Sequence, residues 1–264
     1  MVEKSFKSLI ELDKKFSPAS IWDPLSARMA DRLGIEMLML AGSVASEAHL
    51  GMTDDILLTA TELSDLVTRI TARSSRPLIV DADHGYGVAR NTARTADLLA
   101  RAGAAAITIE DTVLPRPDLA TGKSALVPAE EGLRRVEAAV TVGRRTGLAI
   151  IGRTSAMQIS GAGETVDRLL SYAEAGCDML MPVGSCPVEL LAELGRRSGL
   201  PLMLSTLPPR ITSEAELVSL GVRIVLAGHH PCEAAYRAGF EAYASQAGRQ
   251  EAWSKDEMKR LLSG

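Results

Sequence analysis

The stretch PLIVDADHGYG, residues 77–87, joins an apolar run to two aspartates, a histidine and a glycine-rich turn. Its apolar residues are continuous and do not alternate with polar ones, which is typical of a parallel strand buried on both faces. Asp81, Asp83 and His84 stand where such a strand would end. The stretch therefore predicts a buried strand with a polar site at its carboxyl end.

Similar short apolar runs recur along the chain, and helix-like segments separate them. These runs are ASIWD (19–23), EMLMLAG (36–42), AAITIED (105–111), LAIIGRT (148–154), DMLMPVG (178–184), PLMLST (201–206) and RIVLAGH (223–229). Strands that alternate with helices over about 210 residues predict an α/β fold, a (β/α)8 TIM barrel. An open doubly wound sheet is the alternative, but the G-x-G-x-x-G turn that usually follows its first strand does not occur here.

Domain organisation follows from the absence of internal boundaries in the sequence. No linker, repeat or low-complexity tract divides the 264 residues, so we expect a single domain over residues 1–264. The barrel is expected to span about residues 18–240. The remaining segment, residues 241–264, is expected to be helical and to lie beyond the barrel.

Composition argues against several classes of partner. A net charge of −4 and an aromatic content of 3% do not suit nucleic acid, which needs a basic face and stacking side chains. No apolar run approaches the roughly 20 residues of a membrane-spanning helix, and the N-terminus lacks a signal-peptide core. Cys177, Cys186 and Cys232 are too scattered for a disulfide framework or a zinc site. We therefore expect a cytoplasmic protein with no membrane or nucleic-acid partner.

Polar residues stand at the ends of most predicted strands. In a parallel barrel the carboxyl ends of all strands form one rim, so these side chains should meet at a single mouth. The strand-end residues are Asp23, Gly42 with Ser43, Asp81 with Asp83 and His84, Glu110 with Asp111, Arg153 with Thr154, and His229 with His230.

The acidic residues of this rim predict a metal site. Asp81, Asp83 and Glu110 offer oxygen ligands with no soft ligand nearby, which favours Mg²⁺, or Mn²⁺, over Zn²⁺. Mg²⁺ usually keeps several waters, so one direct carboxylate with water-mediated contacts to the others is plausible chemistry. Without a cation, clustered carboxylates would repel one another and raise each other's pKa.

Other rim residues predict a small α-keto acid as the substrate. Arg153 supplies a planar fork suited to a carboxylate, and the backbone amides near Gly42, Ser43 and Val44 could form a nest for an anion. The substrate's carboxylate and keto oxygen would chelate the metal. The metal would then stabilise the enolate formed when a bond beta to the carbonyl breaks.

Six motifs together resemble the isocitrate lyase/phosphoenolpyruvate mutase superfamily over roughly residues 18–240. They are DPLSARMADRLG (23–34), AGSVAS (41–46), DADHGYG (81–87), TIEDTVLP (108–115), GRTSA (152–156) and AGHH (227–230). Within the superfamily, SIWDPLSAR, AGSVAS and DADHGYG are most similar to the bacterial oxaloacetate decarboxylase branch. The resemblance implies a Mg²⁺-dependent barrel assembled as a homodimer or homotetramer, with a C-terminal helix exchanged between subunits.

The resemblance also implies roles for individual acidic residues and the products of the reaction. Asp81 would be the direct metal ligand, and Asp83 and Glu110 would hold metal-bound waters. Asp54, in the loop expected after the second strand, would bind near the metal shell. The implied reaction is the decarboxylation of oxaloacetate to pyruvate and CO₂.

Substrate-binding roles are implied in the same way for residues of three other strand ends. Gly42, Ser43 and Val44 would cradle the substrate's carboxylate and carbonyl oxygen, and Arg153 would bind the same end. His229 would face the reacting C3–C4 end of oxaloacetate, orient the departing carboxylate or supply a proton.

Some positions depart from the patterns of the superfamily. The segment LPRPDLATGKSALVP, residues 114–128, has neither the Cys and His of the lyase loop nor the Lys-x-Asn-Ser element of the mutases. Leu207 and Ser155 stand where the decarboxylase branch has a Tyr and an Asn or Asp, so the exact keto acid stays open. The alternatives are a C–C lyase of the 2-methylisocitrate type, a P–C enzyme acting on a phosphonate, and a non-catalytic keto-acid-binding barrel.

Three of the rim residues also have structural interpretations. Asp23 precedes Pro24 and a helix, where an aspartate commonly caps the helix N-terminus. Arg153 could pair with Glu110 or Asp111 instead of a substrate. His229 could be a hydrogen-bonded rim histidine without a catalytic role.

Overall fold

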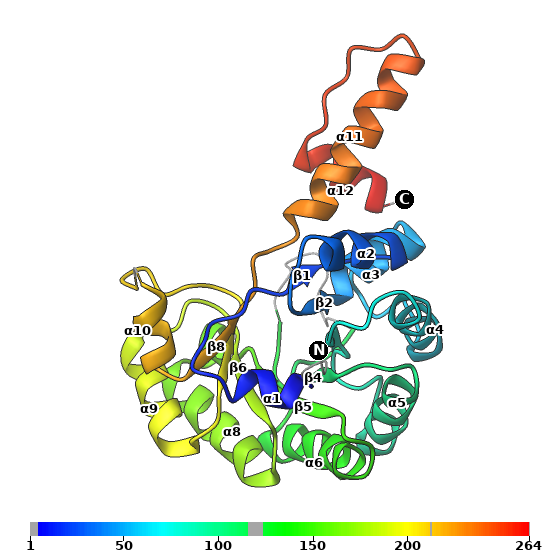
Figure 1. The fold of residues 1–264 in the computed structure, drawn as a ribbon. Coiled ribbons are helices and arrows are strands. Elements are labelled where there is room, and N and C mark those ends of the chain that lie inside the picture. The colour runs from blue at the N-terminus through cyan, green and yellow to red at the C-terminus, as the bar shows by residue number, and fades with distance from the viewer. Residues whose placement is uncertain (1–4, 116–123, 212, 264) are drawn as a thin grey trace.

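The computed structural model describes residues 5–115, 124–211 and 213–263, and within them all the predicted strands form one parallel sheet (Figure 1). The order of the 8 strands follows the sequence from β1 to β8. Their bounds are β1 Ala19–Ser20, β2 Leu38–Leu40, β3 Leu78–Asp81, β4 Ala106–Glu110, β5 Ala149–Thr154, β6 Met179–Pro182, β7 Leu202–Leu204 and β8 Val222–Val225.

The segment just before β1 connects the two edges of this sheet. Phe16 forms a parallel bridge with Ile224 of β8. The Phe16 N–H donates to the carbonyl of Arg223 at 2.7 Å, and its carbonyl accepts from the N–H of Val225 at 3.0 Å. The sheet therefore curls into a TIM-barrel-like fold, as the alternation of strands and helices predicts.

Helices surround the sheet and follow the capping signals of the sequence. Thr59 and Glu62 form a capping box at the start of α4, and Gly147 ends α6 in the left-handed conformation, with φ 84°. The helices are α1 Phe6–Ile10, α2 Pro24–Arg32, α3 Gly42–Leu50, α4 Ala60–Thr71, α5 Ala89–Arg101, α6 Ala129–Thr146, α7 Ala156–Ile159, α8 Ala162–Ala175, α9 Val188–Ser198, α10 Glu214–Ser219, α11 His230–Gln246 and α12 Lys255–Leu262.

Two apolar layers hold the barrel together, because strand side chains point alternately to opposite faces of the sheet. On β2, Leu38 and Leu40 belong to the layer between sheet and helices, whereas Met39 belongs to the layer inside the barrel. The inner layer is rich in Met, Ile and Ala, and Phe6 and Phe16 are its buried aromatic residues. Helix α1 packs Phe6 and Leu9 into this same inner layer.

The C-terminal segment forms an arm that extends away from the barrel (Figure 1). Helix α11 begins at His230, directly after the loop that follows β8, so the arm starts earlier than the expected position 241. Helix α12 follows it, and the rings of Phe240 and Trp253 pack with their centroids 5.4 Å apart. Among the described residues, no helix has both the length and the apolar character needed to cross a membrane.

Candidate active site

Alternation along three neighbouring strands places the predicted acidic residues at the top of the barrel interior. On β3, Ile79 fills the inner layer and Asp81 follows two residues later on the same face. The register pairs Asp81 with Thr108 of β4, and it pairs Glu110 of β4 with Arg153 of β5. The polar residues therefore form the last inward-facing layer above an apolar one.

Arg153 joins two of the predicted metal ligands. Its Nη1 donates to Oδ1 and Oδ2 of Asp81 at 2.9 and 2.8 Å, and its Nε lies 3.0 Å from Oε2 of Glu110 in an ion pair. Thr108 Oγ1 also donates to Asp81 Oδ1 at 2.8 Å. The structure therefore brings Asp81, Glu110 and Arg153 together. It also shows the ion pair of Arg153 with Glu110, which the sequence offered as the structural interpretation of this arginine.

Asp83 completes the acidic group from the turn after β3. It is buried and adopts a left-handed backbone with φ 49°, a conformation that Asp tolerates better than most residues. Its N–H donates to Asp81 Oδ1 at 3.3 Å, and its carbonyl accepts from the N–H of Glu110 at 2.8 Å. The backbone of Asp83 thus links the ends of β3 and β4.

The pKa values of the three carboxyl groups shift in different directions. Burial alone would raise the pKa of Asp81, but Arg153 and Thr108 outweigh it, so this pKa is lowered. Burial and repulsion from Asp81 raise the pKa of Asp83 well above its ordinary value. Burial also raises the pKa of Glu110, although Arg153 opposes the shift.

Asp54 approaches the same mouth from the segment after α3. A Cβ atom on Gly42 would lie 3.1 Å from Oδ2 of Asp54, so a glycine leaves room for this carboxylate. Asp54 also contributes to the raised pKa values of Asp83 and Glu110. Its predicted place near the acidic group is therefore consistent with the electrostatics.

The predicted anion nest is the N-terminus of helix α3. Gly42, Ser43 and Val44 are its first three residues, and Ala41 before them offers no side-chain cap. The first N–H groups of a helix have no carbonyl partner within the helix, and the helix dipole favours negative charge there. This end of α3 can therefore receive a carboxylate or an oxyanion.

His229 connects this helix end to β1 through its two ring nitrogens. Nδ1 lies 2.9 Å from Ser20 Oγ, and Nε2 lies 3.4 Å from Ser43 Oγ. Burial lowers the pKa of His229 below its ordinary value, so the imidazole is neutral at pH 7. Ser20 and Thr108 are residues of the site that the sequence analysis missed; both lie on strands, and Ser20 ends β1.

Several other strand-end residues do not belong to the mouth. Asp23 caps α2, because its Oδ1 accepts from the N–H of Ser26 at 2.6 Å. Asp111 is fully buried and binds residues of α8 on the outer side of the sheet. The charges that act on buried His84 are those of Arg135 and Glu131 on α6, and burial, with a smaller effect of Arg135, lowers the pKa of His84 to about 4.

The positions that depart from the family pattern lie around the same rim. Ser155 is the N-cap residue of α7, and Leu207, in the loop after β7, is 47% exposed. Within the segment 114–128, residues 116–123 lie outside the part of the chain that the structure describes.

The donor set fits a hard divalent cation in charge and in ligand type. Among the described residues, the carboxylates of Asp54, Asp81, Asp83 and Glu110 lie near the guanidinium of Arg153. Over residues 5–115, 124–211 and 213–263, however, no group of three or more His, Cys, Asp and Glu side chains is arranged to hold a metal ion. In the described structure, Arg153 contacts the carboxylate oxygens of Asp81 and Glu110.

Two bacterial enzymes are similar in sequence over most of this chain. Oxaloacetate decarboxylase of Paraburkholderia xenovorans is 40% identical over 235 residues, which are 89% of this chain and 79% of that protein. The enzyme of the same name from Pseudomonas putida is 40% identical over 247 residues, 93% of this chain and 85% of that protein.

Solved structures of similar fold cover almost the whole chain. Oxaloacetate acetylhydrolase in complex with 3,3-difluorooxalacetate has a TM-score of 0.81 at 26% identity, covering 99% of this chain and 93% of that one. 2,3-Dimethylmalate lyase, a PEP mutase/isocitrate lyase superfamily member, has a TM-score of 0.77 at 29% identity, covering 97% and 92%. The family model described as phosphoenolpyruvate phosphomutase matches residues 6–247. The resemblance found in the sequence is thereby confirmed, and the chain belongs to the phosphoenolpyruvate phosphomutase family of the PEP mutase/isocitrate lyase superfamily.

Proposed function

We propose that this protein decarboxylates oxaloacetate to pyruvate and CO₂ with Mg²⁺, or Mn²⁺, as its cofactor. The observation that carries the proposal is the mouth itself, where Asp81, Asp83 and Glu110 surround Arg153 beside the N-terminus of α3. The relatives named oxaloacetate decarboxylase, about 40% identical over most of the chain, support the same substrate.

Decarboxylation requires that one carbon–carbon bond breaks and that the negative charge of the resulting enolate is stabilised. The C3–C4 bond of oxaloacetate breaks, CO₂ leaves, and the electron pair forms the enolate of pyruvate, which then takes a proton at C3. A bound divalent cation supplies positive charge that stabilises this enolate. Asp81 would hold the cation directly, and Asp83 and Glu110 would hold it through water.

The residues around the cation site would bind and orient the keto acid. The amides of Gly42, Ser43 and Val44 would donate to its C1 carboxylate at the N-terminus of α3. Arg153 already uses Nη1 and Nε for the acidic residues, so Nη2 is the nitrogen that would reach the same carboxylate. The C4 carboxylate would then point toward His229, which contacts Ser43.

Removal of the metal tests the function directly. The protein treated with EDTA is expected to release no CO₂ from oxaloacetate above the spontaneous rate, and Mg²⁺ or Mn²⁺ added in excess is expected to restore release. The product assay should detect pyruvate in equal amount to CO₂. Turnover that persists in excess EDTA would contradict the proposal.

A second candidate is hydrolysis of oxaloacetate, because the fold of oxaloacetate acetylhydrolase covers 99% of this chain. The two reactions give different products, since the similar structure is described with oxalate as its product. Oxalate in place of pyruvate would support this candidate.

Turnover of 2-methylisocitrate or phosphonopyruvate, with oxaloacetate untouched, would support C–C or P–C cleavage. Tight binding of oxalate without turnover of any keto acid would indicate a non-catalytic barrel.

His229→Gln is expected to lower kcat by about 10²-fold, because Gln can keep a hydrogen bond but cannot exchange a ring proton. Since burial lowers the pKa of His229, the loss of wild-type activity that its protonation causes should lie below pH 6.5 and be absent from the variant. The measurement is kcat against pH. The control is His230→Gln, because the neighbouring His230 side chain is 83% exposed. An equal loss in both variants would contradict the role of His229.

We also propose that the arm assembles two or more copies of the chain, as a homodimer or homotetramer. An open cavity of about 330 Å³ on the arm is lined largely by apolar side chains, and Tyr243 and Leu261 are 75% and 56% exposed. Apolar surface of this kind on an extended arm suits burial against a second copy. Exchange of the helices between subunits stays a prediction. Sedimentation velocity tests the proposal, and a particle of only 28.0 kDa would contradict it.

A further inference from the structure

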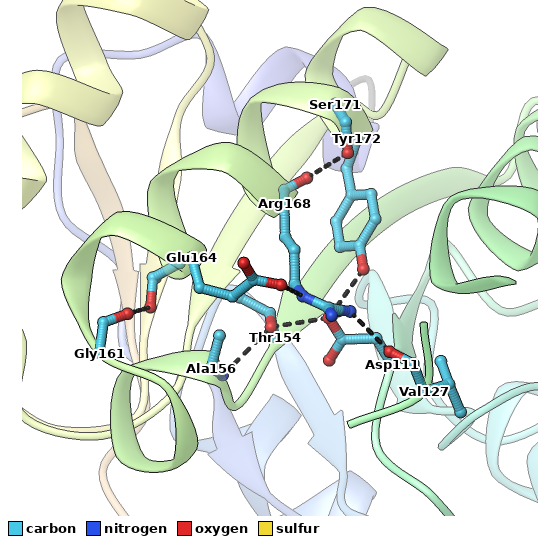
Figure 2. A network of polar contacts seen from close by, with 10 residues as sticks. Asp111, Val127, Thr154, Ala156, Gly161, Glu164, Arg168, Ser171 and Tyr172 are labelled. Atoms are coloured by element: carbon cyan, nitrogen blue, oxygen red, sulfur yellow. Dashed lines mark hydrogen bonds and ion pairs between the residues drawn. The ribbon is translucent and has the colours of Figure 1, made fainter. Parts of the chain in front are cut away.

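Asp111 lies at the centre of a buried polar network on the outer side of the sheet (Figure 2). Its Oδ2 accepts hydrogen bonds from Thr154 Oγ1 at 2.8 Å, from Tyr172 Oη at 2.8 Å and from Arg168 Nη1 at 3.2 Å. The exposed fractions of Asp111, Thr154 and Tyr172 are all 0%. The network is therefore closed to solvent and to substrate.

This network lies directly behind two residues of the candidate active site. Glu110 and Arg153 are the last register partners of β4 and β5. Asp111 and Thr154 are the next residues along the chain, and successive strand side chains point to opposite faces. The hydrogen bond between Thr154 and Asp111 therefore continues the connection of the two strands beyond their last backbone pair.

The three hydrogen bonds to Asp111 connect different parts of the fold. The bond from Thr154 joins one strand end to the other, whereas Tyr172 and Arg168 come from helix α8 (Figure 2). The packing is tight, because a Cβ atom on Gly132 would lie 2.8 Å from Tyr172 Oη and 2.9 Å from Asp111 Cβ. Loss of the Thr154 hydroxyl therefore deletes the hydrogen bond between the two strand ends. Loss of the Tyr172 hydroxyl deletes a hydrogen bond from helix α8 to the same oxygen of Asp111.

We propose that Thr154 and Asp111 are positioning residues for the cation site. Their hydrogen bond fixes the end of β4 against β5, and so it fixes the Glu110 carboxylate at 3.0 Å from the Arg153 guanidinium. Without it, Arg153 would stay on Asp81 while Glu110 moved, and a metal site tolerates displacements of only about 0.5 Å. The inference rests on the proposed function for the identity of the cation.

Thr154→Val and Tyr172→Phe each remove one hydroxyl donor to Asp111 Oδ2, and Thr154→Val also removes the acceptor of the Ala156 N–H at 3.2 Å. Thr154→Val is expected to weaken Mn²⁺ binding by about tenfold or more and to lower kcat similarly. Both variants are expected to lower the melting temperature by similar amounts. The Kd of Tyr172→Phe for Mn²⁺, in contrast, should stay within about twofold of the wild-type value. Thr154→Ser, which keeps the hydroxyl, should restore both values. Electron paramagnetic resonance of free Mn²⁺ gives the Kd without any substrate.

The outcomes separate this inference from the proposed function. Equal Mn²⁺ affinities in Thr154→Val and wild type, or equal weakening in Thr154→Val and Tyr172→Phe, would overturn the positioning role. A wild-type protein that binds Mn²⁺ but leaves oxaloacetate intact would contradict the proposed function alone. A wild-type protein that binds no Mn²⁺ would contradict both.

Discussion

Asp81→Ala is expected to lower oxaloacetate turnover by about a thousandfold while the chain stays folded. Asp81 is the residue on which Arg153 and Thr108 converge, at 2.8 Å each. Its loss removes the proposed direct metal ligand and leaves the Arg153 guanidinium with the ion pair to Glu110 and the nearby charge of Asp83. The measurement is kcat at saturating Mg²⁺, together with the thermal unfolding curve of the same preparation.

The fold should tolerate this change because Asp81 stands in a crowded acidic group. Its charge raises the pKa of Asp83, so its removal relieves repulsion between buried carboxylates. Asp23→Ala is the control, because Asp23 caps α2 from another strand end. That variant should lose about 1 kcal/mol of unfolding free energy and keep its turnover. Full activity in Asp81→Ala, or its failure to fold where Asp23→Ala folds, would contradict the assignment.

Much of this site could be predicted because strand geometry converts spacing in the sequence into direction in space. Asp81 and Asp83 are two residues apart, and Ile79, two residues earlier, packs inside the barrel. Glu110 and Arg153 end neighbouring strands in the same way. A buried apolar run followed by acidic residues at alternate positions therefore indicates an inward-facing polar layer.

The same rule explains which strand-end residues do not face the mouth. Asp111 directly follows Glu110, so it points to the opposite face and contacts helix α8. Thr154 follows Arg153, so it also points to the opposite face, where it donates to Asp111. Asp23 comes after the end of β1, and its neighbour Pro24 begins a helix that it caps. The alternation of side chains along a strand directs Asp111 and Thr154 away from the site, whereas Asp23 is directed away by its role as a helix cap.

Other features depend on contacts between distant segments and could not be predicted from local patterns. Ser20 and His229 are 209 positions apart and meet only because the barrel brings β1 beside the loop after β8. The contacts of Arg153 with Asp81 and Glu110 depend on the register of three strands. The sequence also does not mark the start of the arm, because the helix signal of α11 continues across position 240.

Arg168→Met is expected to destabilise the fold by about 3 to 5 kcal/mol, the largest loss of stability that we predict. Arg168 is 6% exposed, and its Nη1 donates both to Asp111 Oδ2 at 3.2 Å and to the carbonyl of Val127 at 3.0 Å. Methionine would fill much of the volume but would leave the Asp111 carboxylate buried without its cation. Urea unfolding followed by circular dichroism gives the free energy directly.

Arg197→Met is the matched control, because Arg197 forms the same kind of pair on helix α9. Arg168 lies 2.6 Å from Glu164 and Arg197 lies 2.7 Å from Glu193, each four residues earlier in its helix. The Arg197 side chain is 53% exposed, so its loss should cost less than about 1 kcal/mol. The difference between the variants thus gives the combined contribution of the buried contacts with Asp111 and the Val127 carbonyl. A loss in Arg168→Met no larger than that in Arg197→Met would show that the Asp111 carboxylate does not need this cation.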